Sequence, residues 1–209
     1  MKKKNYLTLL ILTISFLGFG IDKRDEGKKK VLIISFIEDN FDTDIYSKEK
    51  IAKKNKIVEE EVLTLYNQKI SSIFTKYAGV EISYIPCPSK TFFALKEKIF
   101  FKNKKLRKEK EGVATDLSNI SVEVFNGFLE EFDADYVLFL NAYQMAWIGD
   151  PQYKLENKIH YSAFKRNKEE IQTNVYTFST PDLMSIMQMT KKYQKAVMKI
   201  SAGLTDVNS

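Results

Sequence analysis

The chain has 209 residues, which is enough for one domain of ordinary size with a single buried core. Its formal net charge of +6 falls to +3 if the first twenty residues are removed, because three lysines lie there, and so small a balance argues against nucleic-acid binding. A single cysteine, Cys87, excludes an internal disulfide.

The first twenty residues have the layout of a secretory signal peptide. Lysines at 2–4 precede an apolar stretch from Leu7 to Phe19, and Gly18 and Gly20 supply small residues before a cleavage site. The stretch is shorter than the roughly 20 apolar residues of a spanning helix. We therefore expect an exported protein, with the periplasm favoured over the extracellular space.

The first part of the remaining chain, 21–209, predicts a strand, a long helix and a second strand. The apolar, β-branched run at 31–37 is typical of a central strand that is covered on both faces. Apolar residues at three- and four-residue steps from Ser47 to Tyr77 predict one amphipathic helix of about 30 residues. Residues 80–85 then predict a strand, which Pro86 terminates.

An insert at about 89–112 follows, with aromatic and aliphatic residues in its first half and cations in its second. After the insert the pattern predicts, in order, a helix, three strands and a closing helix: 124–132, 136–147, 155–163, 171–178 and a helix starting at Thr180-Pro181-Asp182. No linker or repeat divides the chain, so we expect a single α/β domain.

Two helical crossovers imply three parallel strands, and the last three strands then form an antiparallel meander. We expect one mixed five-stranded sheet in the order 2-1-3-4-5, with strand 31–37 in its middle and three main helices packed on it. Because the crossovers leave the first strand in opposite directions, their helices should cover opposite faces.

Two segments resemble known envelope domains. Lys30-Val31-Leu32-Ile33-Ile34-Ser35-Phe36 resembles an opening strand of the type "kvavlpF", and Asp133-Ala134-Asp135-Tyr136-Val137-Leu138 resembles a "gaDyvl" signature. Both are similar to the TolB amino-terminal domain, CsgG and the LpoB group. The resemblance implies an envelope protein that works through contacts, with no catalytic residues to carry over. Asn141 stands where those families usually have glycine, and the insert has no counterpart in them.

The insert is the first candidate for function. Its mixture of aromatic and basic residues suits a patch that contacts a partner protein or an anionic membrane surface. The alternative is an extra helix that only covers the sheet. The candidate contact residues are Phe92, Phe93, Phe100, Phe101, Lys104, Lys105 and Arg107.

The acidic loop after the first strand is the second candidate. It should open at the crevice where the chain direction switches, which is the usual place for a ligand in such sheets. Ile45 stands where a calcium loop needs glycine, and Ile51 where it needs glutamate, so a solvated loop is the alternative. The candidate ligand residues are Glu38, Asp39, Asp42 and Asp44.

No catalytic set is evident. His160 is the only histidine, expected on the exposed face or edge of a strand, and nothing in the spacing makes it a base for Cys87. We expect no cofactor and no metal. The sequence thus predicts a non-enzymatic interaction or scaffold module whose partners are envelope proteins or a membrane surface. The alternative is a secreted binder of a small ligand or divalent cation, or an enzyme, that uses the loop at 38–44.

Overall fold

The computed structural model describes residues 27–42, 48–88, 97–106, 111–149 and 154–205. The expected signal peptide at 1–20 and four candidate site residues lie outside these ranges: Phe92, Phe93, Arg107 and Asp44. Within the described ranges, no helix combines the length and the apolar character that crossing a membrane requires.

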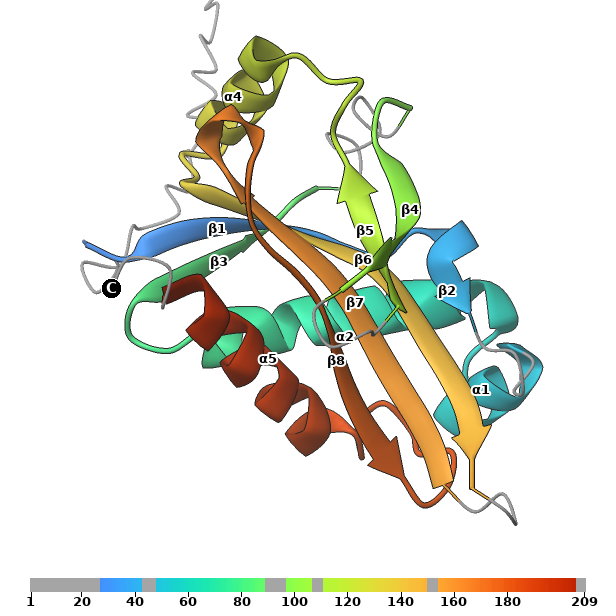
Figure 1. Ribbon diagram of the computed structural model, residues 1–209. Coiled ribbons are helices and arrows are strands. Elements are labelled where there is room, and N and C mark those ends of the chain that lie inside the picture. Colours follow the sequence, from blue (N-terminus) through green and yellow to red (C-terminus); the bar gives the residue numbers. More distant parts are fainter. Residues whose placement is uncertain (1–26, 43–47, 89–96, 107–110, 150–153, 206–209) are drawn as a thin grey trace, which may run out of the picture.

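The expected strands form one mixed sheet (Figure 1). Its order, β3-β1-β6-β7-β8, is the predicted one. β1 pairs in parallel with β3 and β6, and β6, β7 and β8 form the antiparallel meander. The strands are β1 (Lys29–Ile34), β3 (Ile82–Pro86), β6 (Tyr136–Ile148), β7 (Lys154–Lys165) and β8 (Glu169–Thr180).

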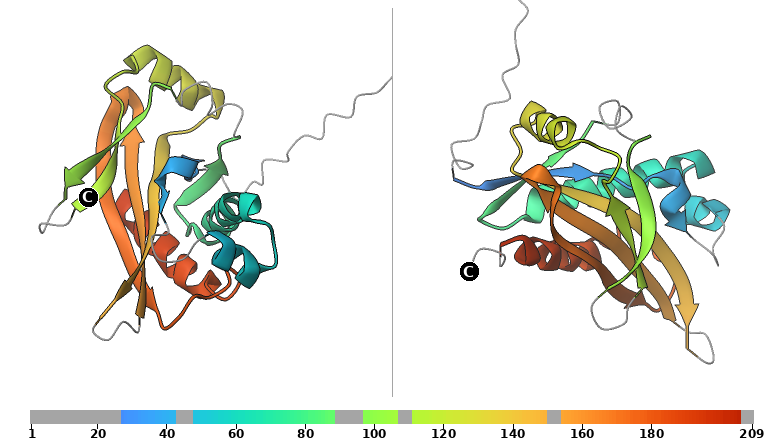
Figure 2. Two further views of the ribbon diagram at one scale, coloured as in Figure 1. Left: turned by 90° about the vertical axis from the view of Figure 1, so that its right-hand side faces the viewer. Right: turned by 45° about the horizontal axis from the view of Figure 1, so that its top comes forward.

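β1 is central and buried on both faces. Val31 and Ile33 enter a core that they share with α2 (Val62–Tyr77) and α5 (Thr190–Thr205). The alternate residues of β1 enter a second core with α4 (Val122–Glu131), which lies apart from α2 and α5 in Figure 2. Because successive side chains of a strand point to opposite faces, a uniformly apolar strand needs helices on both sides.

Asp135 fixes the beginning of β1 against β6. Its carboxylate accepts a hydrogen bond from the backbone N–H of Lys30 at 2.9 Å, and its own N–H donates to the Lys30 carbonyl at 2.8 Å. Asp133, with a φ of 48°, forms an ion pair with the Lys30 ammonium. The pair Asp133 and Asp135 thus marks a turn and also aligns two strands.

The single helix expected between Ser47 and Tyr77 is wrong. The chain forms α1 (Lys48–Asn55), a 3-10 turn at Glu59–Glu61 and then α2. Lys56 has a φ of 60°, and the N–H of Ile57 donates back to the carbonyl of Ala52 at 3.1 Å. This left-handed turn ends α1. Both pieces contribute to the same core, so the apolar spacing continues across the break.

The closing helix begins at Thr190, ten residues later than predicted. Thr180 and Asp182 form a local turn instead, in which the Thr180 hydroxyl donates to the Asp182 carbonyl at 2.9 Å. Ile186 is buried, but it belongs to the irregular segment before the helix. Met187, in the same segment, is 68% exposed.

The described part of the insert contains a strand, so the extra helix considered for it is wrong there. β4 (Phe100–Lys105) and β5 (Glu111–Asp116) form a separate two-stranded antiparallel sheet, the β4–β5 hairpin. A further short strand, β2 (Phe41–Asp42), pairs in parallel with β6 and makes the main sheet six-stranded.

Candidate functional site

The β4–β5 hairpin stands on the face of the main sheet that lies opposite α2 and α5. Tyr161 and Ala163 of β7 enter the core of α2 and α5, so their neighbours His160 and Ser162 point to the other face. β5 pairs with β4 along one edge. In the described part of the chain no third strand pairs with its second edge, which lies over β6 and β7 in Figure 1. Side chains of β6 and β7 bond to this edge.

Buried side chains satisfy the backbone of that second edge. The Val113 N–H donates to His160 Nδ1 at 3.0 Å, and its carbonyl accepts from Asn141 Nδ2 at 2.7 Å. The Thr115 N–H donates to Ser162 Oγ at 3.1 Å, and its hydroxyl donates to Asn141 Oδ1 at 2.6 Å. We call Asn141, His160 and Ser162 the anchor residues; all three are buried. They fix the hairpin because an unpaired buried backbone group is costly.

Asn141 is the central anchor. It lies at an irregularity in the pairing of β6 with β7, between Leu140 and Ala142, and is fully buried. Its amide also donates to Ser162 Oγ at 2.8 Å. This role is not among the predictions from the sequence, although one amide side chain within a run of apolar strand residues is a signal for it.

His160 is a structural acceptor. It is 2% exposed, so the expectation of an exposed or edge histidine is wrong. Burial, together with a smaller effect of the nearby Lys158, lowers its pKa to about 4. Since Nδ1 accepts from Val113, the proton sits on Nε2, which donates to Gln144 Oε1 at 2.9 Å. Both ring nitrogens therefore have partners other than Cys87.

β5 bonds to the main sheet, so β4 is the outer strand of the hairpin, and it presents some of the predicted contact residues. Phe100 is 48% exposed, whereas Phe101 is half-buried and packs on the second core. Lys104 forms an ion pair with Glu170 of β8, at 2.8 and 2.9 Å from its two carboxylate oxygens. Lys105 is exposed and forms no ion pair with the residues that the structure describes.

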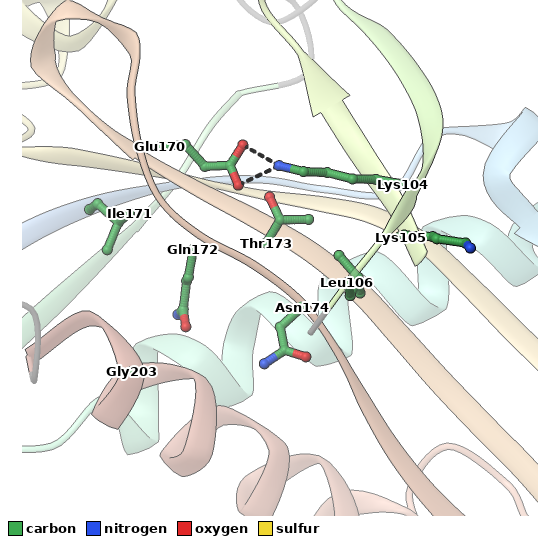
Figure 3. A pocket seen from close by; sticks show the side chains of 9 residues that line it. All are labelled: Lys104, Lys105, Leu106, Glu170, Ile171, Gln172, Thr173, Asn174 and Gly203. Carbon is green, nitrogen blue, oxygen red and sulfur yellow. Dashed lines mark hydrogen bonds and ion pairs between the residues drawn. The ribbon is translucent and has the colours of Figure 1, made fainter. Parts of the chain in front are cut away.

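A groove of about 490 Å³ lies beside the end of the hairpin (Figure 3). One wall is the segment 104–106, the other is Gly203 of α5, and residues 170–174 of β8 form the floor. The ion pair of Lys104 with Glu170 crosses from the wall to the floor.

The acidic loop lines another hollow, which has a volume of about 410 Å³. Asp39 and Asp42 line it together with Gln144, whereas Glu38 forms an ion pair with Lys48. In the described part of the chain, no three histidine, cysteine, aspartate or glutamate residues lie close enough together to hold a metal ion.

The fold and the site define a mixed α/β domain that carries an anchored hairpin. No known protein family matches the chain, and no curated protein matches it. Solved structures similar to it include two PelC dodecamers from Paraburkholderia phytofirmans, one with a point substitution. Each is 8% identical to this chain; the TM-scores are 0.40 and 0.39, with 83% and 85% of this chain and 88% and 87% of theirs covered. So weak a likeness carries no argument about function.

Proposed function

We propose that this protein is an exported, non-enzymatic interaction module of the cell envelope, which contacts a partner protein through the outer strand of the β4–β5 hairpin. One observation carries the proposal. Buried hydrogen bonds fix the hairpin to β6 and β7, while its outer strand, β4, leaves Phe100 and Lys105 exposed. A contact surface that is already ordered loses little conformational entropy on binding.

Two further features support this function. Residues 1–20 have the layout of a signal peptide, which supports export. His160, the single histidine of the chain, is held neutral by burial and engaged at both nitrogens, which suits a structural role. Phe100 is a partly exposed aromatic residue, a type that is enriched at protein contacts.

Site-specific crosslinking in cells tests the proposal. A photo-crosslinking amino acid replaces Phe100 in the full chain, and mass spectrometry identifies the captured neighbours. The matched position is Val80, which is also apolar and is 85% exposed. We expect capture of a defined envelope protein from position 100 and not from position 80.

The same spectra also test export, because the mature protein should begin at Ile21. Phe100→Glu should abolish co-purification of the captured protein, and Val80→Glu should leave it intact. The proposal fails if position 100 captures nothing specific, or if protein with an intact Met1 is recovered from inside the cell.

A small-ligand or cation function for the acidic loop has one observation in its favour, since Asp39, Asp42 and Gln144 line a common hollow. It predicts a rise in melting temperature with a divalent ion or an envelope metabolite, and loss of that rise in Asp42→Asn. A screen that leaves the melting temperature unchanged would eliminate it.

A further inference from the structure

β8 ends the main sheet with an open edge. In the described part of the chain it pairs only with β7, so no strand covers its other side. From Ile171 to Thr180 it carries neither a charged residue nor a proline. Sheet edges are usually protected by lysine, proline, a bulge or a covering element. The pairing of β8 with β7 shifts register at Ile171 and is regular from Gln172 to Thr180. This regular, uncharged part of the open edge is therefore suited to pairing with another strand.

Two walls approach this edge from opposite faces, each beside a glycine. A Cβ at Gly112 would lie 2.5 Å from Leu106 Cδ1 and 3.0 Å from Val175 Cγ2, so the absence of a side chain at Gly112 lets the hairpin pack closely on β8. On the other face, a Cβ at Gly203 would lie 2.5 Å from Gln172 Oε1. The open edge thus forms the floor of the groove in Figure 3.

The backbone of the floor points into this groove. The Val175 N–H donates to the side chain of Asn174 at 2.8 Å, which indicates that this amide faces away from β7. Since backbone groups alternate along a strand, the Thr173 amide two residues earlier faces the same way. The regular part of the floor, from Gln172 to Asn174, extends about 10 Å, which matches three residues of an extended peptide.

The groove favours a negatively charged occupant. Glu170, the carboxylate on the floor, is already neutralised by Lys104. Lys105 lines the same groove and forms no ion pair within the described ranges; Glu111, opposite it in the hairpin ladder, does not line the groove. The remaining polar groups are neutral, as in Gln172 and Asn174.

We propose that this groove binds an extended acidic peptide, which adds to β8 as a further strand and places a carboxylate against Lys105. Main-chain hydrogen bonds supply affinity in this mode, and side-chain contacts supply specificity. The inference rests on the proposed function and names the kind of partner that the module takes. A wall on each face leaves room for one strand, which favours a peptide over the whole sheet of a second copy.

Nuclear magnetic resonance with a defined probe tests the inference. The isotope-labelled protein is titrated with a capped hexapeptide in which glutamate and threonine alternate with valine. Two control peptides carry lysine in place of glutamate, or N-methyl groups on the central backbone amides. We expect a Kd of about 1 mM for the glutamate peptide, shifts concentrated at residues 171–175, and slower hydrogen exchange at the Thr173 amide.

Charge variants of the protein complete the test. Lys105→Glu should weaken binding of the glutamate peptide about tenfold and improve binding of the lysine peptide. Lys54→Glu, the same change at an exposed site on α1, should alter neither. The inference is overturned if the N-methylated peptide binds as well as the parent, if about 5 mM peptide causes no shift at β8, or if β8 pairs with a second copy when no peptide is present.

The two proposals fail separately. Capture of a partner at Phe100 without peptide binding at β8 would retain the interaction module and eliminate the groove as its peptide site. Peptide binding at β8 without any capture at Phe100 would retain the groove and eliminate the outer strand of the hairpin as the contact.

Discussion

Tyr66 is fully buried, yet within the described residues its hydroxyl has no hydrogen-bond partner. Its ring packs edge-on against Phe41 and Tyr143, with centroids 5.0 and 5.4 Å away, and burial raises its pKa well above the ordinary value. The neighbouring Tyr143 hydroxyl, in contrast, donates to Asn157 Oδ1 at 2.9 Å and lies 2.8 Å from the Tyr193 hydroxyl. The two tyrosines share a core and differ in whether their polar atom is satisfied.

We therefore expect opposite effects from removing the two hydroxyls. Tyr66→Phe should leave the free energy of unfolding unchanged or raise it by up to about 1 kcal/mol, because it removes an unsatisfied polar atom. Tyr143→Phe should lower the free energy of unfolding by about 1–3 kcal/mol, because Asn157 Oδ1 and the Tyr193 hydroxyl would each lose a hydrogen-bond partner. Urea denaturation measures both. A loss above about 1 kcal/mol in Tyr66→Phe would reveal a buried partner, such as a water molecule.

His160 makes stability depend on pH. Its pKa falls from 6.5 to about 4 in the folded protein, so the unfolded chain takes up a proton at a higher pH than the fold does. The stabilisation is therefore complete above pH 6.5 and is lost as the pH falls toward 4, by about 2 kcal/mol between pH 7 and pH 5. Protonation would also place a second N–H against that of Val113.

Denaturation at both pH values, in the parent and in His160→Gln, isolates this effect, since no other histidine titrates in the range. The variant should be less stable at pH 7 and should show a flatter dependence on pH. An imidazole resonance that titrates near pH 6.5 in the folded protein would refute the assignment.

At the scale of elements, Gly112 decides how closely the hairpin packs. The sequence analysis placed this glycine at the end of a predicted insert, but it lies inside β5, where a side chain would meet Leu106 and Val175. A glycine within a strand often marks a close approach of this kind. Gly127 of α4 is the opposite case, because a Cβ there would meet nothing within 4 Å.

The two alanine substitutions should differ in sign. Gly112→Ala should lower the free energy of unfolding by about 1–3 kcal/mol through overpacking. Gly127→Ala should raise it by about 0.5–1 kcal/mol, because alanine is the better helix former. Thermal or urea unfolding of the pair checks this. Equal effects would mean that Leu106 moves aside without cost.

Some elements could be predicted from the sequence because their signal is local. The apolar run of β1 and the two crossovers determine the sheet order, since few arrangements bury such a strand on both faces. The break at Lys56 carries neither glycine nor proline, so the apolar spacing alone predicted one helix.

The anchoring of the hairpin could not be predicted, because it depends on residues distant in the chain. Alternation along β7 separates its two faces but does not say what covers each of them. β4 is exposed along most of its length, so its sequence has no regular apolar alternation to identify it as a strand. Asn141, His160 and Ser162 acquire their role only once β5 lies on them.

At the scale of the whole molecule, the parts are held together by bonds of two kinds. β1, β3, β6, β7 and β8 share continuous backbone ladders and lie between two hydrophobic cores. The hairpin has its own ladder, but side-chain hydrogen bonds to the anchor residues and the ion pair of Lys104 with Glu170 connect it to that body. Side-chain interactions therefore join the hairpin to the sheet, whereas a continuous backbone ladder joins each central strand to its neighbours.

Native-state hydrogen exchange should detect this hierarchy. We expect the Val113 and Thr115 amides to exchange through an opening that costs less free energy than global unfolding, whereas the amides of β1 and β6 exchange only with global unfolding. Asn141→Ala should lower the opening free energy of the hairpin by about 1–3 kcal/mol, because it leaves the Val113 carbonyl and the Thr115 hydroxyl unsatisfied. If the Val113 and Thr115 amides exchange at the same free energy as those of β6, the anchor residues join hairpin and sheet into one cooperative unit. In that case, protonation of His160 at low pH should destabilise the whole domain and not open the hairpin alone.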